Sequence, residues 1–554
     1  MMNSFEYIRT TENDKFATNK YKVRNEDGYS VGMNVYPSAA EALAHLKLLR
    51  AFEVMKTKVL SKSEGNPEDV WRVYINNACR RYVMFVSSML AVHQQPTSFN
   101  EFSSIDRALV VDPRFIKQYD ALLPPLDVVY VWYSFMQFPG RYYDTFINTW
   151  VMAFAYFPLP LKRLARAIDD FSFEYRPSPE ERSRYFKFMG RLSEDPADHV
   201  FDVYEMSVFE SVVSLRCPYC RQTLATDIPL TTRKRTGFSD PGFCYAKPAA
   251  SKCRCPYSTI THDELRKWQL LWGLTHPSPL KGIFKHYTEV FHASKDALSI
   301  DDQIKEVAND SGVIELTNFQ AMTPNQLISR MINYAKNQGD LQLAERIHKV
   351  LSVYAKTHLV YLTADKCISE IVVDLVKMCY QVEPFIDRMN KLDWLHSKYY
   401  KGIMHDARKR YTNFVSLAKK SGGFVLAPTL DIDLFWRTHQ ITGYFYMLLS
   451  INPLNFIFDI MEDVTEQDIP NVFEGTASLY ERFTRHEYTT CYCDHCCASK
   501  FPASSSPSSH TPKRSCIMPP ESSTDCGCYG QYECGGGPSV RCGALNIGDK
   551  YDME

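Results

Sequence analysis

The sequence predicts a mainly α-helical protein with one small inserted β element of the zinc-ribbon type. Three observations support this fold class. Apolar residues recur at helical spacing over most of the chain, capping residues mark helix starts, and two close cysteine pairs interrupt the pattern between residues 210 and 265. At 554 residues the chain is too long for one core, so we expect several domains.

The first predicted helix begins after Ser38, because Ser38 and Glu41 have the spacing of a capping box. Asn66-Pro67 open a second helix, with the asparagine as its cap and the proline in its first turn. Residues 1–37 are polar and aperiodic, and we expect them to be flexible. Further helices are expected at 126–137, from 141, at 325–337 and 340–357, in pieces across 365–420, and at 430–450.

These elements are expected to form two related helical halves, at 38–290 and 300–490, with the zinc-ribbon insert at 210–265 in the first half. The tail, 498–554, is rich in Ser, Pro, Gly and Cys and has no periodic apolar positions. Such a segment cannot bury enough surface to offset its ordering entropy, so we expect the tail to be disordered.

A short internal repeat predicts the two related halves. Leu126-Asp127-Val128 leads to Trp132, and Leu430-Asp431-Ile432 leads to Trp436 in the same form, L-D-[VI]-x-x-x-W. Each copy follows a proline where a helix would start, so the shared aspartate falls in the first turn and suits the helix dipole. Duplication explains these matches better than two chance helix starts do.

The seventeen cysteines fall into two clusters, at 217–255 and from 491 onward, with three isolated cysteines elsewhere. The N-terminus lacks the residue order of a signal peptide, and the most apolar stretch, 150–161, is too short to span a bilayer. We therefore expect a soluble, intracellular protein without a transmembrane segment, placed in the cytoplasm or the nucleus. Close cysteine pairs in such a compartment predict metal ligands rather than disulfides.

The strongest candidate site is a zinc ion bound by four cysteines: Cys217, Cys220, Cys253 and Cys255. Zinc takes four soft ligands at tetrahedral corners, and two tight knuckles supply them without a large core. The second knuckle has only Arg254 between its cysteines, so Cys244 and His262 are alternatives for one ligand. The alternative is a set of reduced buried thiols without a metal, and the close pairing favours the metal site over it. A closed four-thiolate site is structural, because it leaves no position for a reacting water.

A second group of cysteines comes where the ordered part is expected to end: Cys491, Cys493, Cys496 and Cys497. Three interpretations remain open for it, namely a second metal cluster, lipid attachment to cysteine, and thiols without a role. Lipid attachment is the weakest of these, because no basic or apolar membrane partner accompanies the group.

His439 raises the question of a catalytic metal held with Asp431 and Asp433. Helix geometry argues against this site, since Asp431 lies about 12 Å from His439 along the helix and Asp433 points to another face. We expect His439 to pack against neighbours such as Phe435, and Asp433 to pair with Arg437 at i,i+4 spacing.

His262-Asp263-Glu264 contains the His-x-Glu of an oxygenase iron site, but helix capping explains this triplet more simply. The Arg233-Lys234-Arg235 turn is a short basic patch without interleaved aromatic residues, which is typical of solvated surface. The sequence shows no phosphate-binding loop and no nucleophile elbow.

In combination, the two motif helices resemble those of the glycine-rich domain-containing proteins of plants and fungi. Residues 124–132, with Phe138-Pro139 and Tyr142-Tyr143, are similar to the first family motif, and residues 428–440 are similar to the second. The motifs at 217–220, 260–263 and 491–497 also fall where fungal members carry theirs. The resemblance covers about residues 40–497.

The resemblance implies a helical domain whose motif residues are Asp127, Trp132, Asp431, Asp433, Trp436 and His439. Members usually have histidines just after both tryptophans, whereas this chain keeps only His439. Plant members are associated with development and stress responses, which names no mechanism. Some fungal relatives carry an oxoglutarate-dioxygenase label, but this chain lacks a matching pattern of jelly-roll strands.

The sequence therefore favours a zinc-stabilised helical scaffold that binds a protein partner. A formal charge of −1 at pH 7 provides no global field toward nucleic acid, which we keep as a weakly supported partner. The alternative function is a metal-dependent enzyme, for example an oxygenase, that uses His439 or His262. Tightly held zinc alone would favour the scaffold, and redox-active iron would favour the enzyme.

Overall fold

The computed structural model describes the following parts of the chain: residues 3–11, 36–92, 119, 121–147, 154, 157–191, 199–205, 207–283, 294–356, 373–421, 425–443, 446–447, 459 and 468–501. Helices dominate these parts, and the strands are few and short. The predicted mainly α-helical fold class is therefore confirmed.

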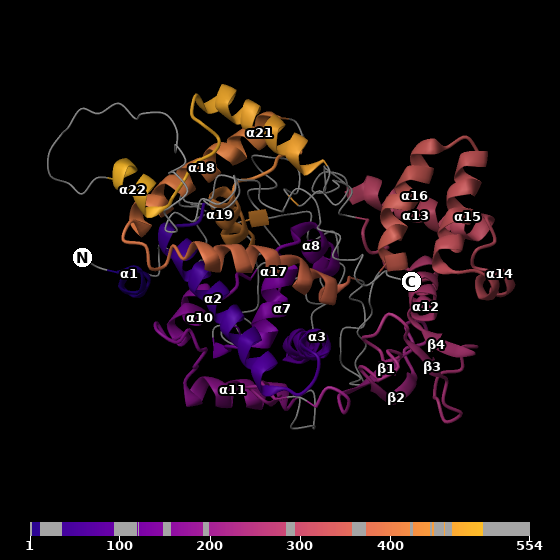
Figure 1. The fold of residues 1–554 in the computed structure, drawn as a ribbon. Coiled ribbons are helices and arrows are strands. Elements are labelled where there is room, and N and C mark those ends of the chain that lie inside the picture. Colours follow the sequence, from indigo (N-terminus) through magenta and orange to yellow (C-terminus); the bar gives the residue numbers. More distant parts are fainter. Residues whose placement is uncertain are drawn as a thin grey trace, which may run out of the picture.

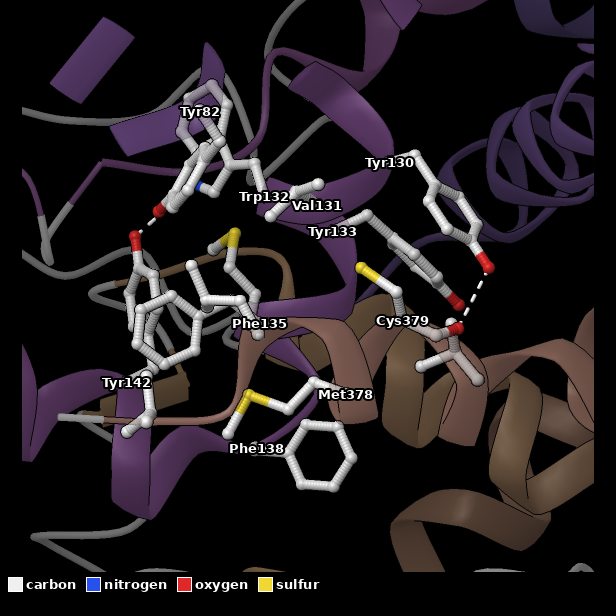
Figure 2. Close-up of a cluster of buried hydrophobic side chains, with 14 of the residues drawn as sticks. Tyr82, Tyr130, Val131, Trp132, Tyr133, Phe135, Phe138, Tyr142, Met378 and Cys379 are labelled. Carbon is white, nitrogen blue, oxygen red and sulfur yellow. Dashed lines mark hydrogen bonds between the residues drawn. The ribbon is translucent and has the colours of Figure 1, made fainter. Parts of the chain in front are cut away.

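The main helical body is built around α7 (Leu126–Met136), all of whose side chains are buried. Its sequence is apolar nearly all round, and such a helix belongs in the centre of a core. The helices that pack against α7 include α2 (Ala39–Lys62), α3 (Pro67–Val92) and α17 (Leu375–Leu392). Figure 2 shows this contact with α17, where the Tyr130 hydroxyl donates a hydrogen bond to the carbonyl oxygen of Cys379 over 2.8 Å.

Helices from the two ends of the chain interleave in this body. From the C-terminal part, α18 (Tyr400–Lys420) and α19 (Leu430–Gln440) contact each other, and both contact α2. In turn, α17 contacts α2, α3 and α7. Helix α19 ends at Gln440, short of the predicted residue 450, because the chain turns at 441–443, where Gly443 has a φ of 57°.

The helix starts that we predicted from capping residues agree with the structure. The capping box of Ser38 and Glu41 opens α2, and α3 begins at Pro67. Six more helices complete the main body: α1 (Ser4–Thr10), α8 (Pro139–Ile147), α10 (Leu161–Ala167), α11 (Pro179–Met189), α21 (Ile469–Thr484) and α22 (Asp494–Lys500). Helix α1 corrects the expectation of a flexible N-terminus at this point, because Phe5 and Ile8 are buried in the core.

A separate helical lobe lies beside this body, on the right of Figure 1. Its helices are α12 (His262–Thr275), α13 (Ser294–Asp310), α14 (Leu316–Ala321), α15 (Pro324–Asn337) and α16 (Leu341–Lys356). Helix α12 precedes the boundary that we expected near residue 295, and α13 follows it. These two helices nevertheless contact each other, and both contact α15 and α16.

The strands form the inserted β element, below α12 in Figure 1. They form two antiparallel pairs, β1 (Val212–Arg216) with β2 (Thr223–Pro229) and β3 (Cys244–Ala246) with β4 (Thr259–Thr261). They fall within the predicted insert at 210–265, and the predicted β element is confirmed.

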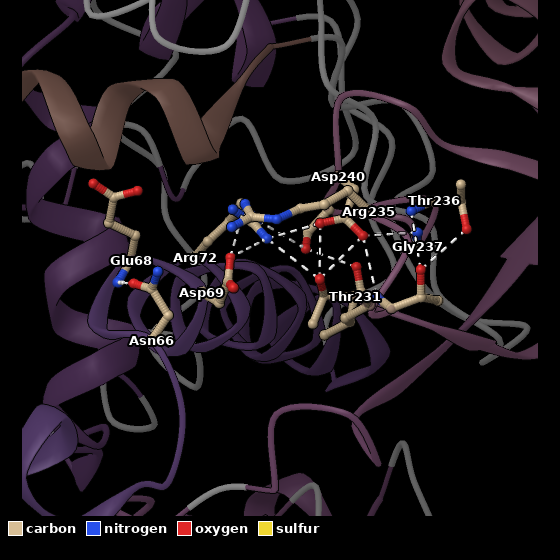
Figure 3. A network of polar contacts seen from close by, with 12 residues as sticks. Asn66, Glu68, Asp69, Arg72, Thr231, Arg235, Thr236, Gly237 and Asp240 are labelled. Carbon is tan, nitrogen blue, oxygen red and sulfur yellow. Dashed lines mark hydrogen bonds and ion pairs between the residues drawn. The ribbon is translucent and has the colours of Figure 1, made fainter.

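A buried polar network attaches this β element to α3, as Figure 3 shows. The guanidinium of Arg72 lies 2.7 Å from the carboxylate of Asp240, which also accepts hydrogen bonds from Thr231 and from the backbone N–H of Gly237. A side chain at Gly237 would meet the Thr231 Cα at 2.5 Å, so this close approach requires glycine.

The described residues test only part of two predictions, namely that the C-terminal tail is disordered and that the chain has no transmembrane segment. The predicted disordered tail at 498–554 lies outside them, apart from residues 498–501, where α22 ends. Within the described parts of the chain, no helix is long and apolar enough to cross a bilayer.

Candidate metal centre

The four cysteines of the two predicted knuckles converge in the β element. Cys217 and Cys220 lie on the turn between β1 and β2, and Cys253 and Cys255 lie on the loop before β4. Their Sγ atoms are 3.8 Å apart for Cys217 and Cys255, 3.5 Å apart for Cys220 and Cys253, and all within 4.8 Å. Tetrahedral bonds of about 2.3 Å to one ion would place sulfur atoms about 3.8 Å apart. The group therefore has the dimensions of a metal site.

Backbone hydrogen bonds hold both knuckles in place. The N–H of Cys217 donates to the carbonyl oxygen of Gln222 over 2.8 Å, and the N–H of Arg221 donates back to Cys217 over 3.0 Å. The N–H of Cys253 donates to the carbonyl oxygen of Thr223 over 3.2 Å, which ties the second knuckle to β2. The thiols are thus brought together by the strand pairing itself.

The alternative ligands, Cys244 and His262, do not take part in this group. Cys244 is exposed on β3. The His262 ring, at the start of α12, packs against the rings of Phe238 and Phe243 at 5.3 Å and 5.0 Å. The single-residue spacing within the second knuckle does not prevent convergence, because Cys255 approaches Cys217 while Cys253 approaches Cys220.

The thiols favour a cation at their centre. Burial, and then the charge of Cys217, raise the pKa of Cys253 to about 12, and burial and the neighbouring thiols also raise the pKa of Cys255. At Cys220 burial is outweighed by the N–H of Gln222 and by the other thiols, and the pKa is lowered. A metal ion would displace the protons and remove the repulsion between thiolates. Four thiolates close its coordination and leave no position for a reacting water.

A second group of thiols lies at the end of the described chain. The Sγ atoms of Cys491, Cys493 and Cys496 are within 4.8 Å of one another, and all three residues are half-buried. Cys497, the expected fourth member, is fully buried and lies outside this group. The group can hold a metal ion with three protein ligands.

Both motif aspartates pair with arginines inside the core. Asp127 on α7 lies 2.7 Å from Arg81 on α3, and Asp431 on α19 lies 2.5 Å from Arg410 on α18. All four side chains are at least nine-tenths buried. Burial is the largest influence on the pKa of Asp127, and it keeps that pKa above its usual value although Arg81 opposes the shift. The aspartates are therefore structural ion-pair partners.

The other motif residues are also buried. Trp132 and Trp436 lie in the core on α7 and α19. Asp433 pairs with Arg437 of its own helix at 3.0 Å, as its spacing predicted.

The roles of Arg81 and Arg410 were not predicted from the sequence, although a second short repeat contains both of them. Arg81-Tyr82 is followed by Phe85-Val86-Ser87, and Arg410-Tyr411 is followed in the same way by Phe414-Val415-Ser416. Each copy lies on the helix that packs against a motif helix.

One comparison with known proteins supports the second motif helix, α19. Residues 329–448 match the family model described as glycine-rich domain-containing protein-like. The predicted resemblance is confirmed for this segment, which comprises 120 of the 554 residues. No curated protein and no solved structure matches the chain. The glycine-rich domain-containing protein-like segment includes α19 with Asp431, Trp436 and His439, whereas the first motif helix and both thiol groups lie outside it.

In the glycine-rich domain-containing protein-like segment, His439 lies among aromatic rings. The hydroxyl of Tyr411 is 2.9 Å from its Nδ1 atom, and the rings of Tyr36 and Tyr446 lie at 5.9 Å and 5.2 Å. These rings come from other elements, and the expected packing of His439 against Phe435 of its own helix stays a prediction. Among the described residues two thiol groups could hold a metal ion, and neither contains His439 or His262.

A hollow of about 800 Å³ opens between the metal centre and α12. Its wall on the β element includes Tyr219, Lys252 and Arg254, and all three side chains are exposed. Its floor includes Trp268 and Leu271 of α12, which are buried. The residues around the metal ligands thus form a groove with basic groups at its rim and an apolar floor. We call it the ribbon groove.

Proposed function

We propose that this protein is a zinc-stabilised helical scaffold that binds an acidic segment of a partner protein in the ribbon groove. The observation that carries the proposal is the position of the groove, whose lining includes Cys220 and Cys255 of the four-thiolate group. An ion bound by these thiolates would fix the loop that carries Lys252 and Arg254. Metal binding and partner binding would then depend on the same loop.

Four thiolates at tetrahedral distances favour zinc among the common metals, although iron accepts the same ligand set. A zinc ion here would contribute folding energy to the β element, since β3 and β4 have three residues each and bury little surface. Metal analysis of the purified chain distinguishes the two ions.

The charge of the β element favours an acidic partner. Residues 212–261 contain eight Lys and Arg against two Asp and Glu, whereas the whole chain has a formal charge of −1. A divalent ion with four thiolates adds two negative charges, so the element remains net positive. Of the two acids, Asp240 is already used in the contact with Arg72. The β element therefore has too few carboxylates to balance the positive charge of the exposed Lys and Arg side chains at the groove rim.

The apolar floor favours a peptide with one large apolar side chain. Trp268 and Leu271 would receive that side chain, and the ring of Tyr219, 5.6 Å from the ring of Trp268, would cover one side of it. Peptide-binding sites commonly combine a few buried apolar anchors with a charged rim.

Nucleic acid fits the groove less well. Tight binding of a strand needs several phosphate contacts along a path and several stacking faces. Two other cations of the β element are engaged: Arg235 pairs with Asp69 at 3.0 Å, and the guanidinium of Arg221 lies 4.4 Å from the centre of the Trp272 ring. The groove lining offers one exposed aromatic ring, Tyr219, and two exposed cations, a combination that suits a short acidic peptide.

Charge reversal tests the proposal. We expect the full chain to bind synthetic peptides in which Asp and Glu flank one Leu, Phe or Trp, and Lys252→Glu with Arg254→Glu to weaken this binding at least about tenfold. Arg233→Glu with Lys234→Glu is the matched control, because these exposed residues lie on the β element but outside the groove lining. Equal loss in both double variants, or binding of single-stranded RNA in place of the peptides, would refute a specific peptide groove.

The zinc part has its own test. We expect purified chain to hold zinc, and Cys253→Ser to release it, whereas Cys244→Ser removes an exposed thiol and should leave zinc in place. Retention of the ion by Cys253→Ser, or iron in place of zinc, would contradict this assignment.

A further inference from the structure

The second thiol group lies on a segment that straps the end of the described chain onto the main body. We call residues 486–501 the C-terminal strap. It runs along α18 and ends with the short helix α22, beside α18 in Figure 1. Cys491 and Cys493 lie before this helix, and Cys496 lies in its first turn.

Two tyrosines anchor the strap in the core. Tyr488 accepts a hydrogen bond at its carbonyl oxygen from Arg410 over 2.6 Å, and its own hydroxyl donates to the carbonyl oxygen of Ala427. Tyr492 is 3 % exposed, and its hydroxyl lies 2.6 Å from a carboxylate oxygen of Asp406 and 3.3 Å from one of Asp431. The strap therefore contributes to the buried network around the second motif aspartate.

The C-terminal end of the strap is held by contacts of Lys500 and Phe501. The ammonium group of Lys500 lies 2.6 Å from Asp406 and 2.7 Å from the hydroxyl of Thr490. The Phe501 ring packs on Gly402 of α18 so closely that a Cβ atom there would lie 2.6 Å from the ring. Between these anchors lie the three half-buried thiols.

We propose that Cys491, Cys493 and Cys496 bind a soft metal ion, and that this ion locks the C-terminal strap onto α18. Tyr492 lies between the first two ligands, so an ion bound to both would restrict the short loop that carries it. The ion would thereby hold the Tyr492 hydroxyl beside Asp406 and Asp431. Loss of the ion would loosen a strap that covers the motif aspartate.

The number of ligands distinguishes this site from the four-thiolate centre. Within the described chain, no fourth Cys, His, Asp or Glu joins the three sulfur atoms. Three thiolates suit copper(I), and they suit zinc if a solvent molecule or a small thiol supplies the fourth ligand. Because one position is left to solution, the ion should exchange faster than the ion of the closed centre.

Metal counting on the full chain tests the site. The triple variant Cys491→Ser, Cys493→Ser, Cys496→Ser should bind one ion fewer per chain than the wild type, with zinc and copper(I) titrated in separate samples. Cys244→Ser removes a thiol elsewhere and should bind as many ions as the wild type. The five cysteines after residue 501 are present in every sample and contribute equally. Equal metal content in the triple variant and the wild type would overturn the site.

Two further measurements test the other parts of the proposal. Cys497→Ala should keep the ion, and its loss in this variant would show a closed four-thiolate site. Removing the ion from the wild type should speed amide hydrogen exchange at residues 487–501 at least about tenfold. Unchanged exchange would refute the lock. Cys253→Ser, which addresses the four-thiolate centre, should leave this ion and the exchange of the strap unaltered, so the two metal proposals fail separately.

Discussion

Trp436 donates its indole N–H to the hydroxyl of Tyr446, ten residues further along the chain, over 2.6 Å. Trp132 donates in the same way to Tyr142, again ten residues further, over 3.3 Å (Figure 2). The ring of Phe414 lies 6.0 Å from Trp436 at 49°, and the ring of Phe85 lies 6.1 Å from Trp132 at 47°.

These matched surroundings support the proposal that α3 with α7 and α18 with α19 derive from one duplicated unit. The two phenylalanines occupy the same place in the repeat that follows the paired arginines. Each copy therefore shares its ion pair, its indole hydrogen bond and its ring packing with the other. Chance resemblance of two helix starts would not produce three matched contacts on two pairs of helices.

The first prediction compares the two tryptophans. Trp132→Phe and Trp436→Phe should each lower the free energy of unfolding by about 1–3 kcal/mol, because each leaves a cavity and a buried tyrosine hydroxyl without its donor. Denaturant unfolding followed by circular dichroism measures both losses. A large loss in one variant and none in the other would contradict equivalent roles.

The second prediction concerns the buried ion pairs. Asp127→Asn and Asp431→Asn should each destabilise the fold by about 3–5 kcal/mol, because each leaves a buried guanidinium without its counter-charge. Asp263→Asn is the control, since its carboxylate is exposed and pairs with Arg266 of the same helix. If the three variants unfold at the same denaturant concentration as the wild type, the buried pairs contribute no net stability.

Local signals in the sequence were sufficient for much of this architecture. A capping box needs only residues three apart, so Ser38 and Glu41 marked the start of α2 correctly. The first knuckle is equally local, because Cys217 and Cys220 lie on one turn. The choice between Cys255 and Cys244 depended on the path of the loop before β4, which the spacing alone does not determine.

Contacts between residues far apart in the sequence could not be predicted from such local signals. Arg81 and Asp127 are 46 residues apart and meet only because α3 packs against α7. The strap places Tyr492 beside Asp431, 61 residues earlier in the chain. The interleaving of α2 with α18 and α19 likewise follows from tertiary packing, and no periodic pattern predicts it.

The third prediction concerns acid stability. His45 on α2 is fully buried, with Nε2 3.1 Å from the hydroxyl of Tyr133 and Nδ1 2.9 Å from that of Thr438. Burial, and then the charge of Arg437, lower its pKa to about 3. In the unfolded chain the pKa returns to about 6.5, so below that pH the unfolded state binds a proton that the folded state does not.

Stability should therefore fall as the pH falls from about 6.5 toward 3, by up to about 1.4 kcal/mol per pH unit from this group. His45→Gln should flatten that part of the profile of unfolding free energy against pH, while His348→Gln, at an exposed position on α16, should not. Denaturant unfolding at several pH values in this window measures both profiles. Parallel profiles for wild type and His45→Gln would show that other groups cause the acid sensitivity.

The last prediction tests whether His439 is a structural residue. The proposed duplication would make Phe135 equivalent to His439, because each lies three residues after its motif tryptophan. The Phe135 ring lies 6.4 Å from Tyr82 at 87° and 5.1 Å from Tyr142 at 80°. The His439 ring lies 5.9 Å from Tyr411 at 85° and 5.2 Å from Tyr446 at 82°. The first copy thus shows that a phenylalanine ring fits these surroundings.

His439→Phe should fold and should lose about 1–3 kcal/mol, because the Tyr411 hydroxyl loses its partner at 2.9 Å. The double variant His439→Phe, Tyr411→Phe should recover most of that loss, since replacing both partners of a buried hydrogen bond by apolar rings is nearly neutral. A catalytic metal ligand would behave differently, because no second substitution would restore a metal-dependent activity. Unfolding free energies of the two variants, measured with the metal content of each, separate these cases: recovery with unchanged metal supports a structural histidine, and loss of an ion with His439→Phe would identify a ligand.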